Sequence, residues 1–204
     1  MKHRPTNIYI DGENLFYQLV SVLIDAKLIK TRADLIKIDL NYLLSHSTKL
    51  VEKPKNTRYY GTKLHLIKDM GDKAYQTSLK MIQQKRAWGS WLSKQNIEFI
   101  TAGNLKARQK GKSVIFQEKG VDVRIAVDLV KSAYEKKGLQ YVIVSSDSDT
   151  IPALRVVAQK GHIITYVGFS EALNMAIVAH SHQTLTFTRE DIIDSFKRVH
   201  HNDK

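Results

Sequence analysis

The sequence predicts an α/β fold, a three-layer sandwich with a mainly parallel central sheet and helices on both faces. Short β-branched or aromatic runs, typical of buried strands, alternate with longer segments of helical periodicity over most of the chain. The clearest strand is Val142–Val144, and the apolar-periodic segment after it contains Pro152 near its start and ends at Gly161. Another short strand, Asn7–Ile10, leads directly into an amphipathic helix. Such alternation is typical of parallel sheets whose strands are joined by crossover helices.

The other elements follow from the same periodicities. Strands are expected at 57–67, with an interruption or bulge at Gly61, and at 97–101, 113–117, 162–168 and 184–187. Helices are expected at 13–24, 40–50, 72–94, from about 121 to 134, from 149 to 160, at 171–179 and at 189–199. In the helix that begins near residue 121, the apolar face is assigned to Val123, Ala126, Val127, Val130 and Ala133.

The length of 204 residues fits one α/β domain with an appendage. Residues 1–169 are expected to form the main domain, with a helical insertion at 27–55. Residues 170–204 are expected to form a helix–strand–helix extension that packs on the same domain.

Composition narrows the function classes. There is no cysteine, which excludes a disulfide framework and a thiolate metal site. The longest apolar region, Leu15–Leu28, is interrupted by polar residues, and the basic N-terminus lacks a signal-peptide core, so a cytoplasmic protein without a membrane segment is expected. The net charge of +12 favours a polyanionic partner such as nucleic acid over a role in solubility alone. No P-loop, G-x-G-x-x-G or G-x-S-x-G motif is present, which disfavours a nucleotide cofactor and a serine hydrolase.

Acidic side chains follow two of the predicted strands at the point where each strand ends. Asp147 and Asp149 come just after Val144, and Asp11 directly follows Ile10. If the two strands are neighbours, these carboxylates form one cluster, whose mutual repulsion a proton or a cation would relieve. Carboxylate oxygens are hard ligands that suit Mg²⁺ or Mn²⁺.

Two further acids lie on the helix that begins near residue 121. Asp122, in its first turn, could simply complement the helix dipole. Asp128 could form an ion pair with Arg124 or Lys131 on the same helix. Six residues separate the two acids, which places them about 120° apart around the helix, so they need not serve the same site.

The segment Gly103–Lys112 is expected to be a polar loop. It carries Lys106, Arg108 and Lys110 at alternate positions. A solvated surface loop and a mobile arm that contacts phosphates near the cleft are both compatible with this pattern.

Three segments together resemble a known family. They are IDGENL at 10–15, KGVDVRIAVDLV at 119–130 and SSDSD at 145–149. Their order and spacing resemble a NYN domain of the LabA-like group, within the PIN-like nuclease superfamily. One departure is Ser146, which stands where the family usually has glycine.

The resemblance implies a Rossmann-like (PIN-like) fold and a metal-dependent ribonuclease that acts on RNA rather than DNA. Asp11, Asp122, Asp147 and Asp149 would be the catalytic, metal-binding acids for Mg²⁺ or Mn²⁺, and Asn14 and Ser145 would support them. Lys119 could contact a phosphate beside the cleft or simply face solvent. Asp128 matches a position that is commonly acidic, without a defined role. The alternatives are a non-catalytic RNA-binding adaptor with the same fold and a metal-dependent phosphatase, and a homodimer is left open.

Overall fold

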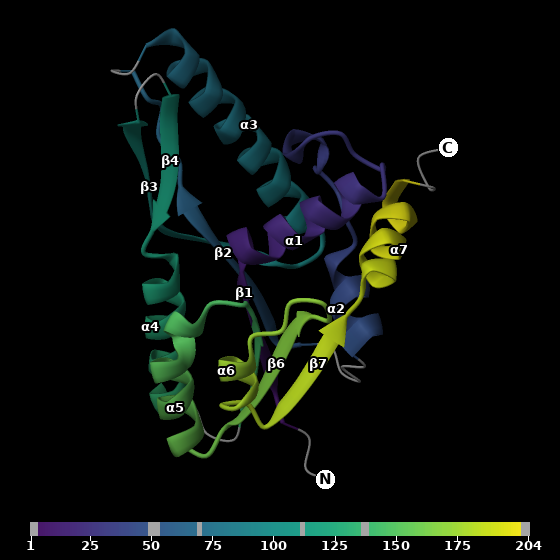
Figure 1. The fold of residues 1–204 in the computed structure, drawn as a ribbon. Helices are drawn as coiled ribbons and strands as arrows, with labels where there is room; N and C mark the ends of the chain where they lie inside the picture. Colours follow the sequence, from purple (N-terminus) through teal and green to yellow (C-terminus); the bar gives the residue numbers. More distant parts are fainter. Residues whose placement is uncertain (1–3, 49–53, 69–70, 111–112, 136–138, 201–204) are drawn as a thin grey trace.

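The central sheet has seven strands in the order β4-β3-β2-β1-β5-β6-β7 (Figure 1). The computed structural model describes residues 4–48, 54–68, 71–110, 113–135 and 139–200. Within them, β3 and β4 pair antiparallel and every other neighbouring pair is parallel. The strands are β1 (Thr6–Asp11), β2 (Asn56–Lys63), β3 (Glu98–Lys110), β4 (Ser113–Lys119), β5 (Gln140–Val144), β6 (Ile163–Phe169) and β7 (Gln183–Phe187). The mainly parallel sheet predicted from the sequence is confirmed.

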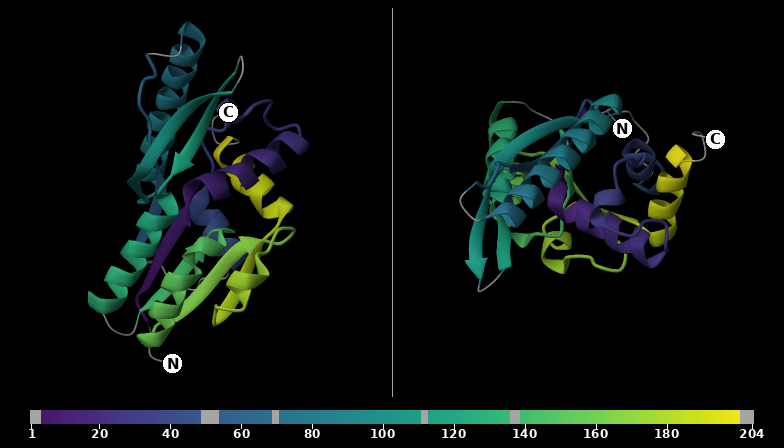
Figure 2. Two further views of the ribbon diagram at one scale, coloured as in Figure 1. Left: turned by 60° about the vertical axis from the view of Figure 1, so that its left-hand side comes forward. Right: turned by 90° about the horizontal axis from the view of Figure 1, so that it is seen from above.

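Helices cover both faces of this sheet (Figures 1 and 2). One core lies beneath α1 (Gly12–Asp25), α2 (Leu40–Thr48), α3 (Asp72–Lys94) and α7 (Arg189–His200). The other lies beneath α4 (Val121–Glu135), α5 (Ile151–Gln159) and α6 (Met175–Val178). Two short 3₁₀ turns, η1 (Arg32–Asp34) and η2 (Ser148–Thr150), complete the described elements. The fold is therefore a three-layer α/β sandwich, as the sequence predicts.

The central strand β1 alternates between the two cores. Ile8 and Ile10 point to the first core, whereas Tyr9 points to the second and stacks between Tyr60 and Tyr141. Successive side chains of a strand face opposite sides of the sheet, and a central parallel strand is buried on both. This explains why the middle of β1, Ile8–Ile10, is a continuous apolar run rather than an alternation of apolar and polar residues.

The register of the two central strands brings their carboxyl ends together. β1 pairs with β5, with Ile10 opposite Val144. The residues that follow, Asp11 and Ser145, therefore lie side by side at one edge of the sheet. The sequence-based condition for a single acidic cluster, that the two strands be neighbours, is met.

Residues 103–110 of the expected polar loop belong to the strand β3 instead. β3 runs to Lys110 and pairs with β4 from Asn104 opposite Lys119 onward. The alternating basic residues are the pattern of an antiparallel strand with one solvated face, which the loop interpretation overlooked. The backbone of Lys106, Arg108 and Lys110 belongs to β3, but their side chains, and Lys112, lie outside the described part of the structure.

Two helix expectations also need correction. In α4 the buried stripe runs through Ile125 and Leu129, while Val123 and Val127 are 66% and 54% exposed. Of the expected face, Ala133 is buried and Ala126 and Val130 pack against the core, so the prediction was wrong for Val123 and Val127. The sequence-based choice also left out Val121, Ile125 and Leu129, which are four residues apart and buried. The helix expected at 171–179 is reduced to Met175–Val178, because Asn174 caps it there.

Among the described residues, no helix combines the length and the apolar character needed to cross a membrane.

Candidate active site

The four predicted acids come from three places in the fold. Asp11 ends β1, Asp122 lies in the first turn of α4, and Asp147 and Asp149 flank the start of η2 after β5. Asp11, Asp122 and Asp147 line a cleft of about 750 Å³, and Asp149 is exposed beside it. The fold thus gathers these carboxylates at the carboxyl ends of two adjacent strands, where ligands bind in open α/β sheets.

Asp11 is the most buried acid of the group, with 6% of its surface exposed. Burial, together with the charges of Asp122 and Asp147, raises the pKa of Asp11 to about 6. Two hydrogen bonds partly offset this rise in the pKa, since the carboxylate accepts from the Asn14 amide at 3.2 Å and from the Ser145 hydroxyl at 3.3 Å. The first of these bonds also caps α1, which explains why the chain turns sharply here.

Asp122 responds to its surroundings in the same way. Burial raises the pKa of Asp122, and the charges of Asp147 and Asp149 add to the rise. The Asp147 carboxylate accepts a hydrogen bond from the Asp149 amide at 2.9 Å, which fixes the turn between them. The four carboxylates are therefore one electrostatically linked group, although they come from distant parts of the chain.

Asn14 and Ser146 tie the two strand ends together. The Asn14 side-chain amide donates to the Ser146 hydroxyl at 2.7 Å, and the Ser146 backbone amide donates to the Asn14 carbonyl oxygen at 3.1 Å. Ser145 makes a parallel link, because its hydroxyl donates to Asp11 and accepts from the Asp147 amide at 3.0 Å. The serine at position 146 does not adopt a positive φ, so the turn accommodates its side chain and uses it.

Sequence reasoning missed Asn174. Its side-chain amide donates to the Ser146 carbonyl at 2.8 Å, while its side-chain oxygen caps α6 by accepting from the Ala176 amide at 2.9 Å. The only sequence signal was an asparagine just before a short apolar run, which predicts a helix cap and nothing about the cleft. Asn174 thus adds a further side-chain hydrogen bond to those that hold the loop after β5.

Arg189 is a second missed residue. It lines the cleft and lies 3.4 Å from Asp25 and 3.9 Å from Glu171, two acids at the same rim. Lys119, which was predicted, is exposed and also lines the cleft. Lys119 and Arg189 therefore line the same cleft as the acids, an arrangement suited to binding a phosphate-bearing ligand.

Asp128 does not join the cleft. It forms an ion pair with Arg124 at 3.0 Å and accepts a hydrogen bond from the Tyr60 hydroxyl at 3.0 Å. Its neighbour on the helix, Asp122, faces the other acids. This matches the angular separation expected for two residues six positions apart.

As placed in the described part of the chain, no three histidine or acidic side chains lie close enough to hold one metal ion. The donor chemistry nevertheless suits a hard divalent cation, since all four groups are carboxylates. The raised pKa values of Asp11 and Asp122 reflect repulsion and burial that a cation would relieve.

The three motifs at 10–15, 119–130 and 145–149 bring their acids together at the carboxyl ends of β1 and β5. The NYN domain model matches residues 5–187 of the chain. The chain belongs to the NYN domain family. NYN domains are generally nuclease-like hydrolases of the PIN-like type, which agrees with an acidic cleft.

The fold is also similar to that of a solved protein. A protein of unknown function from Vibrio parahaemolyticus, VPA0982, superposes with a TM-score of 0.57 at 16% sequence identity, covering 92% of this chain and 95% of the other. At this identity the likeness concerns the fold alone. No protein of curated function matches the chain.

Because the pKa of Asp11 is raised, the free energy of unfolding of the metal-free protein should depend on pH. The folded state holds the Asp11 proton up to about pH 6, whereas the unfolded state releases it near pH 4, so ionisation of Asp11 lowers stability as the pH rises through this window. Asp11→Asn should raise the free energy of unfolding at pH 8 by up to about 3 kcal/mol, with little change at pH 4.

Urea unfolding in EDTA at the two pH values measures this. The exposed Asp194, on α7, supplies the control Asp194→Asn, which should change stability by less than about 0.5 kcal/mol at both pH values. An Asp11→Asn effect of equal size at pH 4 and pH 8 would contradict the explanation.

Proposed function

We propose that this protein is a metal-dependent ribonuclease that hydrolyses RNA phosphodiester bonds in the acidic cleft. The observation that carries the proposal is the convergence of Asp11, Asp122, Asp147 and Asp149 from three segments at one sheet edge. Gathering like charges in this way costs stability, and proteins keep such costs mainly at functional sites. Family membership supports the nuclease class.

The four carboxylates would hold Mg²⁺ or Mn²⁺. Such an ion, when bound, activates water and stabilises charge on the phosphate and the leaving oxygen. The chain's own groups do the rest. Asn14 and Ser145 hold Asp11 in place through their hydrogen bonds, and Lys119 and Arg189 would contact phosphates on either side of the acids.

Two finer assignments belong to the same proposal. The three motifs favour the LabA-like group within the family. The net charge of +12 favours an extended polyanion over a small phosphoester, and single-stranded RNA over DNA follows from the resemblance alone.

The direct test is cleavage of an end-labelled single-stranded RNA in the presence of Mn²⁺, Mg²⁺ or EDTA. Cleavage with either ion and none with EDTA is the expected result. RNA that binds but stays intact in both ions would favour the adaptor alternative. Hydrolysis of a chromogenic phosphate monoester, without RNA cleavage, would favour a phosphatase.

The basic surface also predicts a strong salt dependence. If the protein neutralises several phosphates, log Kd for RNA should rise linearly with log salt concentration, and six contacts with a single strand would weaken binding about 300-fold between 50 and 200 mM. Fluorescence anisotropy in EDTA measures this without cleavage. An affinity that does not change over this range would rule out phosphate contacts as the main source of binding.

A further inference from the structure

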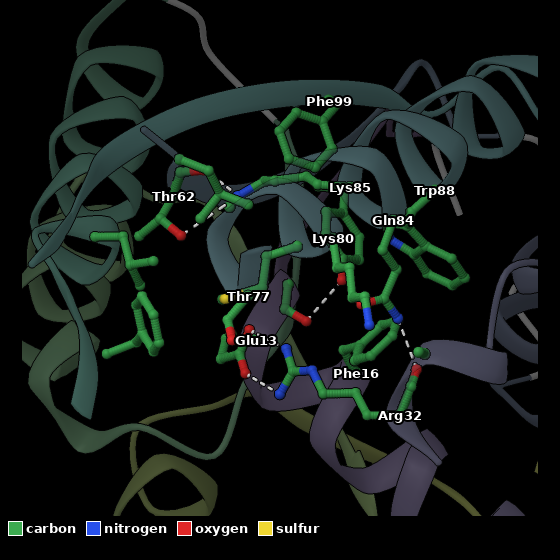
Figure 3. Close-up of a pocket in the computed structure, with 18 of the residues that line it drawn as sticks. Glu13, Phe16, Arg32, Thr62, Thr77, Lys80, Gln84, Lys85, Trp88 and Phe99 are labelled. Carbon is green, nitrogen blue, oxygen red and sulfur yellow. Dashed lines mark hydrogen bonds and ion pairs between the residues drawn. The ribbon is translucent and has the colours of Figure 1, made fainter. Parts of the chain in front are cut away.

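A second pocket lies on the other side of the β1–α1 turn, which follows Asp11. It has a volume of about 590 Å³ and opens between the start of α1, the helix α3 and the β3–β4 hairpin (Figure 3). Figures 1 and 2 show α3 and the hairpin projecting together at one end of the molecule. The volume is within the range of small-molecule sites.

Aromatic side chains from five different elements form the walls. Phe16 meets Trp88 edge-on with ring centres 5.1 Å apart, and Tyr59 stacks on Phe99 at 5.7 Å. Phe116 of β4 completes the set. Flat aromatic walls of this kind suit a flat aromatic guest.

Trp88 has a hydrogen-bond donor that no other described residue uses. Its side chain is 4% exposed, and its indole N–H has no hydrogen-bond partner among the described residues. The neighbouring Tyr59 hydroxyl donates instead to the Gly12 carbonyl at 2.7 Å. A buried donor without a partner is costly and rare, and a guest with a ring nitrogen or carbonyl oxygen would satisfy it.

The rim of the pocket is positive. Lys80 is exposed there, Lys85 lies over the Phe99 ring and is held by Thr62, and Arg32 pairs with Glu13 (Figure 3). Among the described residues that line the pocket, Glu13 is the sole acid. A guest that carries negative charge outside its flat ring would therefore meet a favourable field.

The pocket and the acidic cleft share a wall. Asp11 lines the cleft, Gly12 lines the pocket, and Glu13 lines both. A nucleic-acid strand with a phosphate over the acids can therefore reach the pocket by crossing the turn at Gly12 and Glu13.

We propose that this pocket receives one unstacked nucleobase of the single-stranded RNA whose phosphate lies in the acidic cleft. The placement of the phosphate rests on the proposed function, while the pocket rests on its own aromatic walls, free indole donor and positive rim. Stacking on aromatic walls accepts every base, so the pocket selects for single strands and not for sequence. A base held in a duplex cannot enter it.

The test pairs a change in the RNA with a change in the protein. A set of otherwise identical oligonucleotides, each with a single abasic ribose at a different position, is bound in EDTA and measured by anisotropy. One position should lose roughly 5- to 150-fold in affinity for the unmodified protein, the range that stacking of one base represents. Equal affinity at all positions would overturn the proposal.

Phe116→Ala should weaken binding of the intact RNA by a similar factor and make the sensitive position insensitive to removal of its base. Phe116→Leu keeps an apolar side chain on β4 without the aromatic ring, so it separates lost stacking from a disturbed hairpin and should show the same coupling. Tyr134→Ala, which removes an exposed aromatic on α4 outside the pocket, is the matched control and should bind as the unmodified protein does.

The experiments can refute the ribonuclease proposal and the base-pocket proposal independently of each other. Coupling between Phe116 and one base without metal-dependent cleavage would support the base pocket and refute the ribonuclease. Cleavage without such coupling would refute the base pocket alone. A duplex that binds as tightly as the single strand would also refute it.

Discussion

Asp147→Asn is expected to reduce metal-dependent RNA cleavage by about 100-fold or more while leaving RNA affinity in EDTA within about threefold. A missing metal ligand removes several kcal/mol of transition-state stabilisation, which corresponds to this loss in rate. Asparagine retains the side-chain oxygen that accepts from the Asp149 amide, so the turn after β5 should keep its shape. Removing one negative charge from the cleft should not weaken a polyanion's binding.

Single-turnover cleavage with Mn²⁺, beside anisotropy in EDTA, measures both quantities on the same RNA. Asp194→Asn makes the same chemical change on α7, away from the cleft, and should cleave at the normal rate. Equal rates for Asp147→Asn and the unmodified protein would place the chemistry elsewhere. A loss of RNA binding together with cleavage would mean that the substitution disturbs the fold.

Gly12→Ala is expected to have the largest effect on stability, a loss of about 3 kcal/mol or more. A Cβ at this position would overlap both the Tyr59 ring and the Tyr60 carbonyl oxygen, because α1 starts directly against β2. The backbone oxygen cannot rotate away, so the strand and the helix must separate. The same separation would disturb the acidic cleft and the aromatic pocket, since Gly12 lies between them.

Gly89→Ala is the matched control for this substitution. Gly89 lies within α3, and a Cβ there meets nothing within 4 Å, so alanine should stabilise the protein by about 0.5 to 1 kcal/mol through helix propensity. Urea unfolding of both variants measures the contrast. A Gly12→Ala protein as stable as the original would show that α1 and β2 are not held at this distance.

The elements that the sequence specified well are those with a strong local period. The helix predicted at 72–94 begins and ends at those residues in the structure, because its apolar spacing and its end signals agree. The strands predicted at 97–101 and 113–117 are present, but the continuation of β3 through residues 102–110 was missed, because alternating polar residues in a strand have the composition of a loop. The buried face of α4 was misassigned for a related reason: valine and alanine occur on two of its faces, and only the sheet decides between them.

The meeting of Asp11 with Asp147 could be anticipated because both acids come at the ends of strands, whereas Asp122 was assigned to the same group only through the family resemblance. Asn174 and Arg189 could not be anticipated, because Asn174 contacts Ser146 from the segment after β6 and Arg189 lines the cleft from the start of the last helix. The aromatic pocket is a more extreme case, since its walls come from elements spread between Phe16 and Phe116. In the sequence each of those residues resembles an ordinary core aromatic, and only their arrangement around one pocket indicates a ligand site.

The pairing of β1 with β5 has a consequence for biosynthesis. Asn14 and Ser146 are 132 positions apart, yet their mutual hydrogen bonds hold the two halves of the cleft together. A chain emerges from the ribosome with its N-terminal part first, and a contact between such distant residues can form only after the later one has appeared. The nascent protein therefore lacks a complete acidic cleft until residue 146 has left the ribosome, although Asp11 and Asn14 are made among the first residues.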